Sequence, residues 1–245
     1  MSLDAGAIPS GDLGKLGERV DAMRAAIAAA AREAGRDPAS VALLGVTKGQ
    51  PRAVVLAAIG AGLADIGESY LQEARPKYFG LPAVRKHFIG HVQTNKARAI
   101  VETFDVVQSI DRIEAARAIA RAGRGIGKPV RVLLQVNVSP SERFGFVPEE
   151  APAIAARLRT DEGLEIDGVM AIGPPGGDRA GIAAAFRRAA AAFEGVGGST
   201  FSVGMSGDWR EAIACGSTMV RLGTALFGPR PAKERRKPGD EPARG

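Results

Sequence analysis

Two basic side chains that interrupt apolar segments are the residues best placed to do chemistry. Lys48 ends the apolar run from Val41 to Thr47 and is followed by Gly49 and Pro51, so it stands where a buried strand stops. A lysine amine at the carboxyl end of such a strand can attack a carbonyl carbon and form a Schiff base. The alternative is a solvated lysine that closes a strand.

Arg221 is the second such residue, because it interrupts the apolar segment Met219 to Gly228. A charge in a buried strand needs a partner. Alternation along the strand puts Gly223 and Ala225 on the same face as Arg221, and residues this small leave space for a ligand. The alternative is a structural ion pair with an internal carboxylate such as Glu68.

An anion-binding arrangement is predicted around Ser206. Ser206 and Gly207 precede a helix whose first turn contains Asp208, and Gly223 and Thr224 belong to the same expected region. Backbone amides at a helix start, a hydroxyl and a glycine that permits close approach suit a phosphate group, which barrels commonly bind after their seventh and eighth strands. The alternative for Ser206 is ordinary helix N-capping.

Eight apolar segments are expected to position these residues. Predicted strands cover residues 41–48, 64–68, 86–90, 105–110, 129–138, 168–172, 199–204 and 219–228, and they alternate with predicted helices. A further helix over residues 12–34 precedes them. This order predicts an α/β fold, a single (β/α)8 TIM-type barrel with an extra N-terminal helix. A doubly wound open sheet is the alternative, but no Gly-x-Gly-x-x-Gly turn follows the first strand.

Two of the helix starts carry capping signals. Ser69 followed by Gln72 forms a capping-box pattern, and Pro76 is expected to disturb the helix that it opens. Asp111, with Glu114 three residues later, is expected to cap the helix that ends at Gly123.

Composition bounds the domain organisation. The 245 residues are 45% hydrophobic, enough for one barrel, which typically takes about 250 residues, or for two small domains. We expect a flexible N-terminus over residues 1–11, the barrel over 12–230 and a disordered basic tail over 231–245. The segment 230–245 carries six basic and three acidic residues, so half of the net charge of +6 lies there. The tail lacks interleaved aromatic residues, so we expect no nucleic-acid partner.

Few residues favour disulfide, metal or membrane chemistry. Cys215 is the single cysteine and is expected to be buried and inert within an Ala-rich helix. His87 and His91 lack a nearby third ligand, so no metal site is predicted. The chain start resembles no signal peptide and no apolar run has membrane-spanning length, so we expect a cytoplasmic protein without a membrane partner.

Several motifs, taken in order, resemble those of one protein family. They are Gly45-Val-Thr-Lys48, Ile66-Gly-Glu-Ser-Tyr70, His87-Phe-Ile-Gly-His-Val-Gln-Thr-Asn-Lys96, Ser109-Ile-Asp-Arg112, Leu133-Leu-Gln-Val-Asn-Val-Ser139, Met170-Ala-Ile172, Gly204-Met-Ser206 and Met219-Val-Arg-Leu-Gly-Thr-Ala-Leu-Phe-Gly228. Together they resemble the pyridoxal phosphate homeostasis proteins, whose fold is like the barrel domain of alanine racemase. The order of the motifs makes the resemblance far more specific than any one motif.

The resemblance implies a cofactor and the residues that hold it. Pyridoxal 5′-phosphate (PLP) would be in imine linkage to Lys48, with Arg221 facing the pyridine nitrogen. The cofactor-binding residues predicted in this way are Lys48, Ser206, Arg221, Gly223, Thr224, Met205 and Ser69. The family usually has Asn in place of Ser69, which weakens the expectation of an amide contact from that position.

The resemblance also implies a function without substrate turnover. Proteins of this family carry and buffer PLP in vitamin B6 and amino-acid homeostasis, so we expect PLP-dependent apo-enzymes as recipients, a monomer and no catalytic residues. An arginine at the pyridine nitrogen cannot protonate it, which disfavours transamination. The alternative is a PLP-dependent amino-acid racemase or another PLP enzyme of the same fold. Such a racemase resembles a two-domain protein whose second base comes from the other domain.

Overall fold

A closed barrel of parallel strands forms the centre of the computed structural model, which describes residues 10–139 and 144–228. Successive strands pair with each other, and β1 pairs with β8 to close the ring. The strands are β1 Ala42–Val46, β2 Asp65–Glu68, β3 Arg85–Phe88, β4 Val106–Ile110, β5 Arg131–Val136, β6 Glu165–Ala171, β7 Thr200–Ser202 and β8 Met219–Leu222. The predicted (β/α)8 fold is confirmed.

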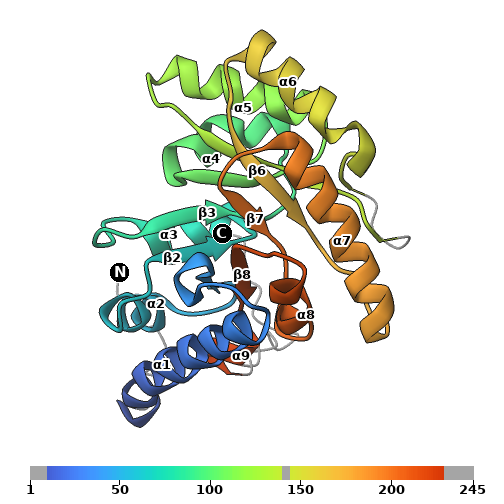
Figure 1. The fold of residues 1–245 in the computed structure, drawn as a ribbon. Helices are drawn as coiled ribbons and strands as arrows, with labels where there is room; N and C mark the ends of the chain where they lie inside the picture. Colours follow the sequence, from blue (N-terminus) through green and yellow to red (C-terminus); the bar gives the residue numbers. More distant parts are fainter. Residues whose placement is uncertain (1–9, 140–143, 229–245) are drawn as a thin grey trace, which may run out of the picture.

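Helices surround the ring of strands (Figure 1). They are α1 Ser10–Glu33, α2 Arg52–Gly60, α3 Leu71–Tyr78, α4 Ala97–Thr103, α5 Ile113–Gly125, α6 Ala151–Glu162, α7 Arg179–Val196, α8 Trp209–Ala214 and α9 Thr224–Phe227, with 3-10 turns at Pro38–Ser40, Thr94–Lys96 and Pro148–Glu150. The extra helix α1 packs against α2, α8 and α9, and its residues Leu16 and Val20 are buried. This helix therefore covers the outside of the barrel where β1 meets β8.

The last predicted strand is shorter than expected. The segment over residues 219–228 forms a strand only to Leu222, and after Gly223 it continues as α9. Leu226 and Phe227 are buried as helix residues. A short apolar run suits a buried strand or a buried helix equally well by periodicity, which explains the wrong prediction.

Both predicted side-chain caps are wrong. The N-cap of α3 is Tyr70 and that of α5 is Arg112, and neither makes a side-chain cap. At α3, the Glu68 carboxylate at the strand end accepts the amide N–H groups of Ser69 and Tyr70, at 2.8 and 3.2 Å. This carboxylate from the preceding strand fixes the two residues that lead into α3, and it does not cap the first turn of the helix.

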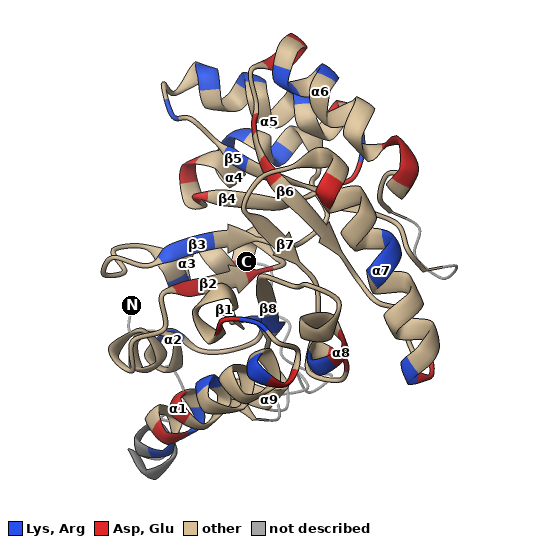
Figure 2. Ribbon diagram, in the orientation of Figure 1, with Lys and Arg blue, Asp and Glu red and all other residues tan. Residues whose placement is uncertain are grey.

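The outer helices carry mixed charge (Figure 2), with basic and acidic residues interspersed along α1, α6 and α7. Exposed ion pairs such as Arg188 with Glu149 link neighbouring helices. Among the described residues, no helix is both long and apolar enough to cross a membrane. The predicted tail over residues 231–245 and most of the predicted flexible N-terminus lie outside the described ranges.

Candidate cofactor site at the carboxyl ends of the strands

A cavity of about 300 Å³ opens at the carboxyl ends of β1, β7 and β8. Its lining residues are Val46, Lys48, Gln50, Met205, Ser206, Gly207, Arg221, Gly223, Thr224 and Gly228. Six of the predicted cofactor-binding residues meet here, and Ser69 instead lines a neighbouring pocket. The ring closure explains the meeting, because the pairing of β8 with β1 brings the carboxyl ends of the first and last strands side by side.

The amine of the half-buried Lys48 contacts an aromatic ring. Its Nζ lies 4.5 Å from the centroid of the Tyr70 ring, within the range of a cation–π contact. It makes no hydrogen bond or ion pair with any residue that the structure describes. Tyr70 is 47% exposed and Lys48 is half-buried, so this contact orients the amine without sealing it from the cavity that Lys48 lines. The amine therefore stays available to a ligand in the cavity.

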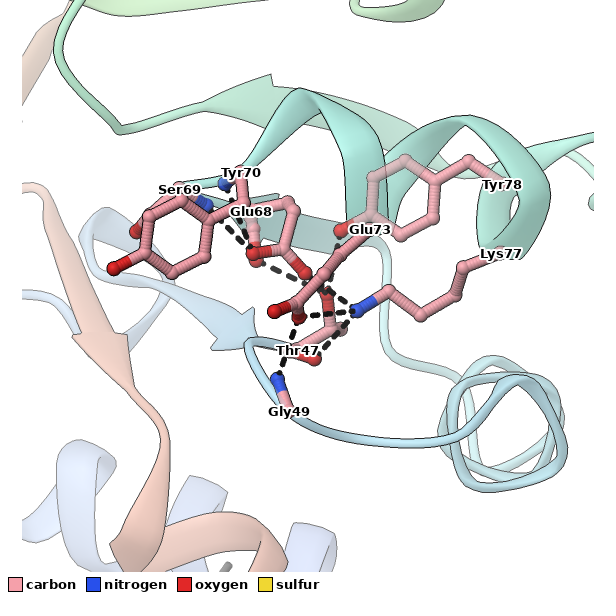
Figure 3. Close-up of polar contacts among 9 residues, drawn as sticks. Thr47, Gly49, Glu68, Ser69, Tyr70, Glu73, Lys77 and Tyr78 are labelled. Carbon is pink, nitrogen blue, oxygen red and sulfur yellow. Dashed lines mark hydrogen bonds and ion pairs between the residues drawn. The ribbon is translucent and has the colours of Figure 1, made fainter. Parts of the chain in front are cut away.

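Two side chains of helix α3 form hydrogen bonds with the backbone on both sides of Lys48 (Figure 3). The Lys77 Nζ donates to the Thr47 carbonyl at 2.8 Å, and the Gly49 N–H donates to Glu73 Oε2 at 3.0 Å. Gly49 has a φ of +72°, a left-handed conformation that glycine adopts at little cost. The peptide groups before and after the lysine are both anchored, which fixes where its side chain starts.

A buried ion pair holds Lys77 in the position from which it makes this contact with Thr47. Lys77 Nζ lies 2.5 Å from Glu68 Oε2, with side chains that are 7% and 0% exposed. Glu68 also accepts the N–H groups of Ser69 and Tyr70, which precede α3, so one carboxylate joins the end of β2 to α3. The alternative role of Arg221, a structural ion pair with a carboxylate such as Glu68, is therefore wrong for Glu68. Lys77 was not recognised from the sequence, although its position four residues after Glu73 is a pairing signal.

Arg221 is buried among neutral acceptors. It is 4% exposed, and its guanidinium donates to the carbonyl and hydroxyl of Ser202 at 2.6 and 2.8 Å and to the Ala171 carbonyl at 2.9 Å. Burial lowers its pKa to about 10, and the carboxylate of Asp208 offsets this in part at longer range. A guanidinium has five N–H groups, so donors remain for a ligand. A buried cation without a direct carboxylate favours an electron-rich or anionic ligand.

A chain of hydrogen bonds runs from Arg221 through the barrel. The Ser202 hydroxyl donates to Gln108 Oε1 at 2.7 Å, and Gln108 Nε2 lies 2.9 Å from His87 Nδ1. His87 Nε2 lies 2.9 Å from Asp65 Oδ1. Every donor in this chain finds an acceptor if His87 is neutral and carries its proton on Nε2. The chain explains how the barrel interior tolerates several buried polar side chains.

The predicted anion cradle has open donors. The Ser206 hydroxyl accepts the Ala225 N–H at 3.4 Å, at the start of α9. The amide N–H groups of Ser206 and Gly207 have no acceptor among the described residues. The alternative role of Ser206 as a cap of α8 is wrong, because the N-cap of α8 is Asp208 and no side chain caps that helix.

Gly223 is a glycine that packing alone does not require. A Cβ built on it would meet the Val46 Cβ at 3.5 Å, an ordinary contact distance. Gly204 is different: its φ is +97° and a Cβ would lie 2.6 Å from the Ala212 Cβ, so glycine is needed for the turn that leads from β7 into the cradle.

The remaining candidates lie outside the cavity. His91 Nδ1 pairs with Asp111 Oδ2 at 2.9 Å, and the described residues contain no group of three or more side chains suited to a metal. Cys215 is half-buried at the C-cap of α8, not within the helix as expected, and its Sγ lies 3.6 Å from the Ala183 carbonyl. Burial raises the pKa of this thiol.

Comparison with known proteins gives consistent relatives. The model of the alanine racemase N-terminal domain matches residues 19–231. The pyridoxal phosphate homeostasis protein of Pseudomonas aeruginosa is 43% identical over 220 residues, which cover 88% of this chain and 96% of the relative. That of Escherichia coli is 37% identical over 219 residues, which cover 85% and 94%.

Solved structures agree with these relatives. PipY of Synechococcus elongatus, solved with PLP bound, superposes with a TM-score of 0.76 at 32% identity, covering 87% of this chain and 100% of PipY. Alanine racemase from E. faecalis superposes with a TM-score of 0.70 at 18% identity, covering 90% of this chain and 59% of the racemase. At that identity the racemase shares the fold alone.

Proposed function

The chain belongs to the family of pyridoxal phosphate homeostasis proteins, which share the alanine racemase N-terminal domain, and from this premise we propose that it binds PLP and carries or buffers it. When bound, PLP supplies an aldehyde carbon that a primary amine can attack. The Lys48 amine is the residue proposed to make this linkage. No turnover of a substrate is part of the proposal.

The residues of the cavity fit the cofactor group by group. The Ser206 hydroxyl and the backbone at Gly223 and Thr224 are proposed to hold the phosphate, since open amides and hydroxyls are its usual partners. Arg221 is proposed to donate a hydrogen bond to the pyridine nitrogen. It keeps its own proton, because a guanidinium with a pKa of about 10 stays charged at neutral pH. Met205 lines the same cavity, and a contact from Ser69 stays a prediction.

One observation carries the proposal. The free amine of Lys48 and the buried guanidinium of Arg221 line the same cavity as the open donors of the cradle. The cavity offers an amine for an aldehyde, a donor for a ring nitrogen and a cradle for a phosphate. PLP is one ligand that carries all three of these groups. The PLP-bound relative PipY supports the same ligand.

The racemase alternative needs a second group that exchanges protons with the substrate. Tyr78 is unsuited to this role, because it is 3% exposed, its hydroxyl lies 2.6 Å from Thr47 Oγ1, and burial raises its pKa far above the ordinary range. Tyr70 is exposed, but its ring lies against Lys48 itself. We therefore favour a carrier, which acts as a cytoplasmic monomer and delivers PLP to apo-enzymes. A turnover assay with alanine separates the two functions.

Borohydride reduction followed by peptide mapping tests the linkage. The phosphopyridoxyl mass should appear on the peptide containing Lys48, and Lys48→Ala should lose the visible absorbance of the imine. Lys86 and Lys96 serve as internal controls, because both are lysines of the same β3–α4 region outside the cavity. A label on either of them, with Lys48 unmodified, would refute the assignment.

A further inference from the structure

A second pocket lies beside Tyr70, at the carboxyl ends of β2 and β3. Its volume is about 320 Å³, and ligand pockets typically measure roughly 300–1,000 Å³, so it suits a small molecule. Its lining residues are Ser69, Tyr70, Leu71, Gln72, Phe88, His91, Gln93, Lys96 and Ile100. Four of these residues belong to the segment from His87 to Lys96, which the proposed PLP site does not use.

The charge of this pocket is one-sided. Lys96 is half-buried, and its amine makes no hydrogen bond or ion pair with any described residue. No Asp or Glu lines the pocket. The nearby carboxylate of Asp111 is already occupied, since it pairs with His91 and with Arg112 at 2.9 and 2.7 Å. The Lys96 ammonium therefore has no local neutralising partner, and a charge-assisted hydrogen bond to an anion would supply one.

The walls of the pocket limit what the anion can be. Leu71, Phe88 and Ile100 present apolar surface, and Phe88 and Ile100 are almost completely buried. A single unpaired cation beside apolar walls suits one negative charge on an apolar body better than a phosphate dianion. An amino acid is less suitable, because its ammonium would find no carboxylate among the lining residues.

We propose that this pocket binds a small monocarboxylic acid with an apolar body, its carboxylate on Lys96 and its body against Leu71, Phe88 and Ile100. Aliphatic acids and 2-oxo acids belong to this class. The proposal does not depend on the Lys48 linkage, because neither Lys48 nor Arg221 lines this pocket. Of the residues predicted to contact PLP, Ser69 is the one that does line it. It adds a ligand site lined by Tyr70, whose ring also contacts the Lys48 amine.

Titration calorimetry on the full-length protein tests the site with 4-methylpentanoate, a probe that lacks a carbonyl able to react with Lys48. The wild type should bind the probe. It should bind the neutral amide of the probe, and leucine, at least tenfold more weakly. Lys96→Gln should weaken binding by roughly tenfold or more, the usual worth of a hydrogen bond to a charged group. Since Lys96 has no described side-chain partner, this variant should have the same melting temperature as the wild type.

Lys86→Gln is the matched control. Lys86 is also half-buried without a described side-chain partner, but it lies near the amino end of β3, away from the pocket. Its replacement should leave the affinity unchanged. Absence of binding by the wild type, an equal loss in Lys86→Gln, or leucine binding as tightly as 4-methylpentanoate would each overturn the proposal.

Discussion

The surroundings of Arg221 distinguish a ligand-binding role from a structural one. Its acceptors are two carbonyls and a hydroxyl, and no described carboxylate pairs with it directly. Replacing this arginine with an apolar side chain of similar size removes the desolvation cost of a buried charge, which offsets part of the cost of taking a donor away from its acceptors. The free protein should therefore tolerate the loss of Arg221 better than the PLP complex does.

Arg221→Met is expected to bind PLP more weakly and to shift the visible spectrum of the imine, because the ring nitrogen loses its hydrogen-bond donor. Thermal melting with and without PLP, together with absorbance spectra, measures both effects. The stabilisation by PLP should shrink, and the melting temperature without PLP should change less. An equal loss with and without PLP and an unchanged spectrum would mean that Arg221 is structural.

Gly223→Ala separates ligand contact from packing in a similar way. A Cβ at this position meets only ordinary contacts in the free protein, the nearest being 3.5 Å away. We expect the variant to fold with near wild-type stability and to lose PLP affinity by tenfold or more, because the methyl group would occupy space near the phosphate. Gly17→Ala in α1 is the control, since nothing lies within 4 Å of its Cβ. An unchanged dissociation constant for Gly223→Ala would remove Gly223 from the phosphate site.

At the scale of elements, α3 is the part that positions the reactive lysine. Its contacts reach Thr47 and Gly49, on either side of Lys48, and its ion pair with Glu68 ties it to the end of β2. Helix α3 carries no proposed cofactor residue, but it sets the position of Lys48, which follows β1. The buried pair is the most sensitive point of this arrangement.

Lys77→Met is expected to reduce the free energy of unfolding by about 3–5 kcal/mol, because it leaves the Glu68 carboxylate buried and unpaired. Urea denaturation measures the loss. Adding Glu68→Gln should recover part of it, since the amide oxygen can still accept the N–H groups of Ser69 and Tyr70 and no charge stays buried. A double variant less stable than Lys77→Met alone would contradict this account of the pair.

The alternation of apolar segments and punctuating residues predicted the barrel and most strand positions, because each strand of a parallel barrel is buried on both faces. It also predicted which residues meet, since strand ends in a barrel share one edge. It did not predict the partner of Glu68, and the alternative of a pair with Arg221 is wrong because that partner comes from α3 and not from β8. Pairings across space depend on register and side-chain direction, which spacing along the chain does not encode. The end of β8 failed for a simpler reason, because a short apolar run fits either type of element.

At the scale of the whole molecule, the barrel interior contains a directed chain of hydrogen bonds from Arg221 to Asp65. It begins at the proposed ring-nitrogen donor and ends at the amino end of β2, where Asp65 also pairs with the exposed Arg85 at 3.3 Å. Its other four members, Ser202, Gln108, His87 and Asp65, come from four different strands. The chain therefore links the two ends of the barrel, and Gln108 is its middle member.

Gln108→Leu tests whether this chain is a unit. The substitution keeps a similar side-chain volume but leaves the Ser202 hydroxyl without an acceptor and His87 Nδ1 without a donor. Each of these two buried groups left unpaired costs about 1–3 kcal/mol, so urea denaturation should show a loss of about 2–6 kcal/mol. Because the freed Ser202 hydroxyl can turn away from Arg221, PLP affinity should fall as well. Gln93→Leu, at an exposed position, should change the free energy of unfolding by less than about 0.5 kcal/mol. If Gln108→Leu lost stability and kept full PLP affinity, the chain would support the fold without reaching the cofactor site.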